Sequence, residues 1–191
     1  MRRYKDCWSN KPHIVKLEKA AQPIVFVDYN LKPGTQLDCR NPKPLTMHKD
    51  PSKTVRRADC CCGNSVVEVQ ADPVIYGICN CSNCKKRTGS AFGLSAYFHQ
   101  SDFQVVCGDF RSYELCNEFG AQKRNFCTNC GTTLFWYAES FKGMIGVAGG
   151  CFIKNPLPKP HFIAQNENRC SWVSFHETIK IGFRKEDLPC A

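Results

Sequence analysis

Short apolar runs, separated by glycine, proline or polar residues, follow one another along the chain from Arg57 onward. Runs of this length rich in valine, isoleucine and aromatic residues are typical of β-strands, and the glycines and prolines between them favour turns. The predicted strands span residues 65–70, 74–78, 91–99, 103–106, 110–115, 123–126, 132–137, 144–148, 161–163 and 172–175. There is no long helical periodicity, internal repeat or low-complexity tract, so the sequence predicts a mainly β fold.

The first 56 residues have a different composition. Six of the eleven prolines lie there, together with an excess of lysine and arginine. We therefore predict a largely irregular N-terminal extension over residues 1–56, a folded domain over 57–180 and a C-terminal tail over 181–191. No run of 18 apolar residues predicts a membrane span, and the first residues lead into no apolar signal segment. The expected location is the cytoplasm, with the nucleus as the alternative.

One six-residue stretch, 79–84, contains three cysteines. Cys79 and Cys81 are two residues apart, so on an extended chain their side chains point to the same face. A turn through Ser82 and Asn83 would bring Cys84 back to the same point. Three thiols without an obvious fourth ligand indicate a zinc ion with an open position, which is the arrangement of a reactive zinc.

Two further cysteine pairs frame this stretch. Cys60 and Cys62 form a C-x-C pair, Cys127 and Cys130 form a C-x2-C pair, and a glycine directly follows each pair. The four thiols are enough to close a tetrahedral zinc site, and the glycines suit the tight backbone of a metal-binding turn. Spacing alone leaves the division into four and three ligands open, since another thiol could complete the second site. Cys61, which lies inside the first pair, could also compete for metal.

The chain has fifteen cysteines in all. A disulfide framework is the weaker interpretation, because the start of the sequence does not resemble a secretory signal. The cysteines outside the three groups are expected to be packed or exposed thiols. These are Cys7, Cys39, Cys61, Cys107, Cys116, Cys151, Cys170 and Cys190.

The formal net charge is +9. Seven zinc-bound thiolates and two Zn²⁺ ions would contribute −7 and +4, which lowers this charge to +6. A basic protein of this kind suits anionic partners, whether a small carboxylate-bearing substrate or a nucleic acid. Residues 85–90 are expected to form a short basic turn beside the three-cysteine stretch.

The order and spacing of these motifs resemble those of the glutathione-dependent formaldehyde-activating enzyme family, which includes centromere protein V. The resemblance covers about residues 57–176. The matching elements are Cys60-x-Cys62-Gly63, Cys79-x-Cys81-x2-Cys84 with Gly89, Phe126-Cys127-x2-Cys130-Gly131-x2-Leu134, Ala148-Gly149-Gly150, Pro160-His161 and Trp172.

This resemblance implies an Mss4-like fold in which two antiparallel sheets are built around zinc. It also implies a structural zinc and a catalytic zinc. The ligands of the structural zinc would be Cys60, Cys62, Cys127 and Cys130. The ligands of the catalytic zinc would be Cys79, Cys81 and Cys84.

The implied activity is that of a carbon–sulfur lyase, which forms or cleaves an S-hydroxyalkyl adduct of glutathione and an aldehyde such as formaldehyde. Basic side chains near the open site could contact the carboxylates of glutathione. The candidates are Lys85, Lys86, Arg87, Lys123 and Arg124.

The sequence leaves two questions about function open. His99 is a candidate fourth ligand or base, although a lone histidine more often has no such role, and no role follows for His161 or Cys61. The alternative to an enzyme is a non-catalytic, zinc-stabilised binding module for chromatin or protein, like centromere protein V. A steep loss of DNA affinity with salt would favour that alternative.

Overall fold

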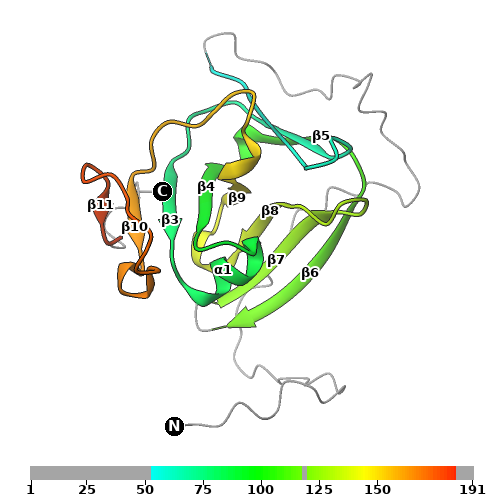
Figure 1. The fold of residues 1–191 in the computed structure, drawn as a ribbon. Helices are drawn as coiled ribbons and strands as arrows, with labels where there is room; N and C mark the ends of the chain where they lie inside the picture. The colour runs from blue at the N-terminus through cyan, green and yellow to red at the C-terminus, as the bar shows by residue number, and fades with distance from the viewer. Residues whose placement is uncertain (1–52, 118–119, 184–191) are drawn as a thin grey trace, which may run out of the picture. The chain divides into compact units, whose positions relative to one another are not determined.

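Two β-sheets and one short α-helix make up residues 53–117 and 120–183, the part of the chain that this computed structural model describes (Figure 1). These residues all belong to one compact unit. The mainly β fold with two sheets, predicted from the sequence, is confirmed. Almost all of the predicted N-terminal extension, and residues 184–191 of the predicted tail, lie outside the described residues.

The smaller sheet has three antiparallel strands in the order β1-β2-β5. Its strands are β1 (Arg56–Asp59), β2 (Val66–Val69) and β5 (Phe103–Cys107). The larger sheet has the order β11-β10-β3-β4-β9-β8-β7-β6. Its strands are β3 (Ile75–Cys79), β4 (Gly93–His99), β6 (Phe110–Asn117), β7 (Gly120–Cys127), β8 (Thr133–Ala138), β9 (Met144–Ala148), β10 (Phe162–Ala164) and β11 (Lys180–Ile181).

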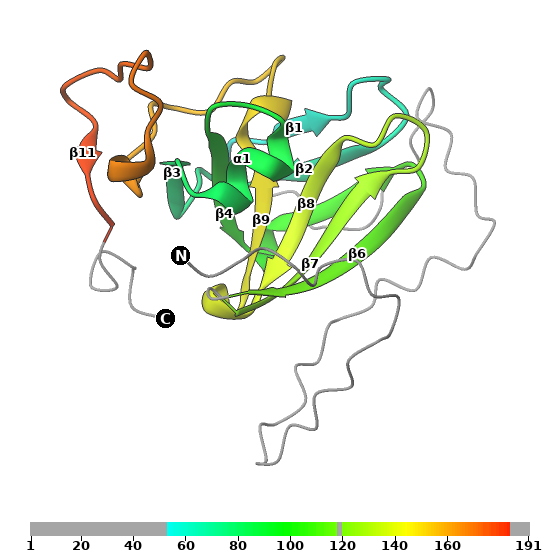
Figure 2. The same cartoon turned by 60° about the horizontal axis from the view of Figure 1, so that its bottom comes forward.

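The helix α1 (Ser82–Thr88) follows β3 directly and packs against β4 (Figures 1 and 2). Short 3-10 turns complete the described secondary structure. They span Gln100–Asp102, Glu139–Phe141, Gly149–Cys151 and Asn166–Asn168. None of the helices in the described residues is long and apolar enough to cross a membrane.

The main hydrophobic core joins the two sheets. Val67 and Val69 of β2 belong to the same buried cluster as Phe98 of β4 and Ile145 of β9. Burial of each such side chain contributes about 1.5–3 kcal/mol. Since neighbouring residues of a strand point to opposite faces, Tyr97 of β4 points away from this core and belongs to a separate cluster. The larger sheet therefore has one face against the core and another face toward α1.

The structure differs from the predicted strands at the C-terminal end. Residues 172–175, which were predicted as a strand, form none. Trp172 is 77% exposed, so its side chain makes little contact with the core. The strands β1 and β11 were not predicted, and they extend to Arg56 and Ile181. The domain boundaries at residues 57 and 180 stay a prediction.

The sheets are also not wholly antiparallel. The strand β10 runs parallel to both β3 and β11, whereas the other pairings are antiparallel. The connection before β10, residues 152–161, brings the chain back so that β10 runs in the same direction as β3. Apolar patterning alone does not distinguish the two directions, because it reports burial and not strand order.

Candidate metal centres

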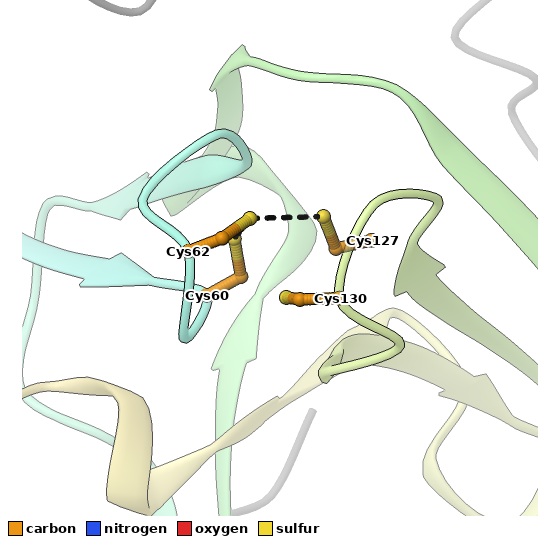
Figure 3. Close-up of side chains that lie close together, drawn as sticks. All are labelled: Cys60, Cys62, Cys127 and Cys130. Atoms are coloured by element: carbon orange, nitrogen blue, oxygen red, sulfur yellow. Dashed lines mark hydrogen bonds between the residues drawn. The ribbon is translucent and has the colours of Figure 1, made fainter.

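Four cysteine sulfurs meet where two loops approach each other (Figure 3). The Sγ atoms of Cys60, Cys62, Cys127 and Cys130 all lie within 4.8 Å of one another. Sγ of Cys62 is 3.5 Å from that of Cys60 and 3.8 Å from that of Cys127. Sixty-five residues separate Cys62 from Cys127, so this cluster joins distant parts of the chain.

Each cysteine pair is held by a tight turn of similar design. The amide of Gly63 donates to the carbonyl of Cys60 at 2.9 Å, and the amide of Gly131 donates to the carbonyl of Cys127 at the same distance. Both glycines have a positive φ, 76° and 74°, which residues with a side chain rarely adopt. The glycine after each pair is therefore required by the turn that points the thiols inward.

The surroundings of these thiols shift their pKa values in opposite directions. Burial raises the pKa of the Cys60 thiol to about 12. Burial also acts to raise that of Cys130, but hydrogen bonds, first from the Thr132 hydroxyl and then from backbone amides, more than offset it and lower the pKa to about 6. Hydrogen bonds therefore favour the thiolate form of Cys130, whereas burial disfavours the thiolate form of Cys60.

The second cluster forms where β3 passes into α1. The Sγ atoms of Cys79, Cys81 and Cys84 lie within 4.8 Å of one another. Cys79 ends β3, and Cys81 caps the N-terminus of α1 in an extended conformation. The sequence predicts a turn here, and the structure has a helix instead. The amide of Cys84 donates to Sγ of Cys81 at 3.3 Å, so the thiol takes the part of a capping side chain.

The thiol of Cys81 is the anionic member of this trio. Hydrogen bonds from Cys79 and Cys84 lower its pKa to about 2, against the effect of its burial, and the amides of Cys84 and Asn83 act in the same direction. Hydrogen bonding with its neighbours, and then burial, raise the pKa of Cys79.

Small residues on the larger sheet make room for this cluster. Gly93 lies opposite Cys79 across the β3–β4 ladder, and a side chain on it would begin 3.0 Å from Cβ of Cys84. The same point is 3.0 Å from Nη2 of Arg87. The absence of a side chain at Gly93 thus allows a close approach of α1 to β4.

Aromatic residues continue the same face beyond Gly93. Two residues apart along β4, Gly93, Ser95 and Tyr97 point to one side of the sheet. The hydroxyl of Tyr97 accepts a hydrogen bond of 3.1 Å from Nε1 of Trp136, which lies two strands away on β8. Burial raises the pKa of Tyr97 to about 12, so this phenol is neutral. These two side chains meet because β9 alone separates β4 from β8 in the sheet, an order that the sequence does not reveal.

The remaining residues singled out from the sequence lie elsewhere. His99 is exposed at the opposite end of β4 from Gly93, roughly 20 Å along the strand, so it is neither a ligand nor a base of this cluster. His161 is exposed and helps to line a separate cavity of about 190 Å³. Cys61 is outside the four-sulfur cluster, and its amide donates to the Thr132 hydroxyl. Cys107 is disulfide-bonded, contrary to expectation.

Both cysteine clusters lie in the part of the chain that matches a known protein family. The model of the family described as "Glutathione-dependent formaldehyde-activating enzyme" matches residues 55–166, more than half of the chain and all seven clustered cysteines. The chain belongs to this family. The chain is also similar to a crystal structure of a Rhodobacter sphaeroides protein, at 24% sequence identity and a TM-score of 0.42. That similarity covers 51% of this chain and 87% of the other.

The four-sulfur cluster of this family member has the dimensions of a zinc site. Tetrahedral zinc with bonds of about 2.3 Å to sulfur places its ligands roughly 3.8 Å apart. The two Sγ–Sγ distances given above, 3.5 and 3.8 Å, agree with that spacing. The three-sulfur cluster offers the same soft donors with one fewer ligand. Both clusters could hold a metal ion, and zinc fits their donors.

Proposed function

We propose that this protein is a zinc-dependent carbon–sulfur lyase that forms or cleaves an S-hydroxyalkyl adduct of glutathione and an aldehyde, with formaldehyde as the first candidate. Its structural zinc would be held by Cys60, Cys62, Cys127 and Cys130. Its catalytic zinc would be held by Cys79, Cys81 and Cys84. Family membership supports the reaction class, since the family is described by that activity.

The difference between the two sulfur clusters supports this division. The first has four thiols, which satisfy a tetrahedral ion. The second has three, and within the described residues no other histidine, cysteine or carboxylate joins them. Three protein ligands leave a tetrahedral position for a substrate, which is the observation that carries the proposal.

The reaction joins a thiol to a carbonyl. The S–H bond breaks, an S–C bond forms, and the electron pair of the C=O π bond moves to the oxygen, which takes up a proton; cleavage is the reverse. Zinc in the three-thiol site would supply a Lewis acid that favours the thiolate of the substrate. Holding both reactants in place contributes several kcal/mol, and up to about 7–11 kcal/mol in the best intramolecular cases.

Residues of the chain itself would shape the ligand space. The helix α1 places Cys84 and Arg87 over the small residues of β4, and Trp136 lies below the guanidinium of Arg87. The hydroxyls of Ser95 and of the neutral Tyr97 add polar groups to this face beside the indole ring of Trp136. Such a face suits a small organic substrate with one or two polar groups.

Metal content with and without glutathione tests the proposal most directly. We expect two zinc ions per chain and tighter retention of one of them when glutathione is present. Aldehyde- and glutathione-dependent product should appear with the wild type and be lost in Cys84→Ser. One zinc per chain under both conditions, with no product, would contradict the proposal.

The same preparation tests the alternative of a binding module. DNA affinity that falls steeply with salt, together with no product, would favour a chromatin-binding role. The basic N-terminal extension that suggested this role lies outside the described residues.

A further inference from the structure

Two arginines flank the three-cysteine cluster. Arg87 projects from α1, and its Nη2 donates to the hydroxyl of Ser95 at 3.2 Å. Since Nη2 and Cβ of Cys84 both lie 3.0 Å from one point above Gly93, they are within about 6 Å of each other. Cζ of Arg87 also lies 4.2 Å from the ring centroid of Trp136. This guanidinium is thus held in place beside the thiols.

Arg124 approaches from the other side, on β7. Its Nη2 donates to Oδ1 of Asn83 at 2.8 Å and to Oε1 of Gln122 at 3.0 Å. Asn83 immediately precedes Cys84, so this contact ties β7 to the metal-binding end of α1. In the register of the sheet, Arg124 lies opposite Trp136, the residue on which Arg87 stacks. The two guanidiniums therefore share one aromatic neighbour.

Neither arginine has an acidic partner within residues 53–117 and 120–183. Their hydrogen-bond acceptors are the neutral oxygens of Ser95, Asn83 and Gln122. The Nε of Arg124 is buried and has no hydrogen-bond partner in the described part of the chain. Burial, and then the charge of Arg87, lower the pKa of Arg124. A partly buried cation without an acidic partner is unfavourable, so the fold maintains a positive charge here that favours binding of an anion.

The protein's own thiolates satisfy only part of that need. Three thiolates and one divalent cation carry a net charge of −1, whereas the two guanidiniums carry +2. The site would therefore retain one positive charge until an anionic ligand arrives. Guanidiniums bind carboxylates with short, charge-assisted hydrogen bonds, and the acceptors that these two arginines have in the described residues are all neutral.

We propose that Arg87 and Arg124 together form a carboxylate-binding site that selects anionic thiols for the three-cysteine cluster. The inference rests on the proposed function in one respect, that the thiol of the ligand binds at the three-cysteine cluster. The preference of the site for an anionic ligand is a separate claim. It assigns these two residues, out of the five basic candidates, to substrate specificity. The other three differ: Lys85 donates to the carbonyl of Asn168, Lys86 is exposed, and Lys123 pairs with Glu114.

The first experiment compares ligands and needs no variant. Dissociation constants of the zinc-loaded protein are measured by calorimetry for glutathione and for glutathione diethyl ester, which keeps the thiol but has no carboxylate. We expect the ester to bind roughly 10- to 100-fold more weakly, the size of a lost charged hydrogen bond. Equal affinities would overturn the inference.

The second experiment assigns the preference to the arginines. Arg87→Gln and Arg124→Gln should weaken glutathione binding by at least about tenfold and leave ester binding nearly unchanged. Lys86→Gln is the matched control, because it removes the same charge from an exposed position of the same helix. Zinc content is measured for every variant, so that loss of metal is not mistaken for loss of the carboxylate contact. Variants that lose no more affinity than Lys86→Gln would contradict the assignment.

A simpler pair of thiols separates this inference from the proposed function. 3-Mercaptopropionate and its methyl ester are compared in the same way. If the protein binds no glutathione but prefers the acid to the ester, the arginine site stands and glutathione is not the substrate. If neither pair shows a preference while glutathione and formaldehyde still form product, the function stands and the arginine site does not.

Discussion

Gly146 of β9 lies directly opposite Trp136 of β8, and the indole ring covers the place where a side chain on residue 146 would stand. A Cβ atom there would be 2.3 Å from Cε2 and Nε1 of Trp136. On its other side, Gly146 lies opposite Tyr97 of β4, whose hydroxyl accepts the indole hydrogen bond. The missing side chain thus lets Trp136 reach across β9 to Tyr97 and lie beneath Arg87.

Gly146→Ala should therefore destabilise the domain. The added methyl group forces the indole out of its position, and overpacking of this kind costs about 1–3 kcal/mol. Denaturant unfolding measures the change. Gly150→Ala is the matched control, since a Cβ at residue 150 meets no atom within 4 Å and its φ is not positive; it should be nearly neutral. Equal stability of the two variants would contradict this account of Gly146.

The two sulfur clusters should respond differently to the loss of one ligand. Cys127→Ser should unfold the domain, because structural zinc contributes about 10–16 kcal/mol of binding free energy to folding and its cluster ties distant loops together. Cys79→Ser should stay folded and lose the second metal ion. Circular dichroism and metal analysis check both. Equal thermal stability of the two variants would contradict the division into structural and catalytic sites.

Tyr97 should make the stability depend on pH in alkaline solution. Burial raises its pKa from 10.0 to about 12, so between these values the unfolded chain releases a proton that the folded protein keeps. The unfolded state then binds fewer protons, and the free energy of unfolding falls as pH rises, by up to about 1.4 kcal/mol per pH unit for this group. Below pH 10 the effect is absent.

Tyr97→Phe supplies the comparison for that pH dependence. The variant should be less stable by about 1–3 kcal/mol near neutral pH, because Nε1 of Trp136 loses its acceptor. It should also show a shallower loss of stability between pH 10 and 12, measured by urea unfolding. If wild type and variant lose stability in parallel over that interval, Tyr97 titrates normally.

Cys151 should react slowly with alkylating reagents. Burial, and then the nearby Asp59 carboxylate, raise the pKa of its thiol from 9.0 to about 11, and the thiolate is the reactive form. The hundredfold smaller thiolate fraction should slow carbamidomethylation at pH 8 by about 100-fold relative to an unperturbed thiol. Mass spectrometry of the iodoacetamide-treated protein, with exposed Cys116 as internal reference, measures it. If Cys151 is modified as fast as Cys116, the prediction of a slowly reacting Cys151 thiol is wrong.

The sequence by itself determined the local features of this protein. Short β-prone runs predicted most of the strands. The spacing of apolar residues along the chain shows which side chains of a strand are buried, and this spacing is a local property of the sequence. The C-x-C, C-x-C-x2-C and C-x2-C motifs predicted which thiols cluster, because ligand spacing and the glycine after each pair depend on a few adjacent residues.

Tertiary structure alone decided which distant residues meet. The Tyr97–Trp136 bond, the parallel placement of β10 and the approach of Arg124 to Asn83 all follow from strand order and register. The sequence named five basic candidates near the open site, and only the packing of α1 on β4 and β7 distinguished Arg87 and Arg124 from the rest. Long-range pairing depends on how separate elements pack together, and no local pattern encodes it.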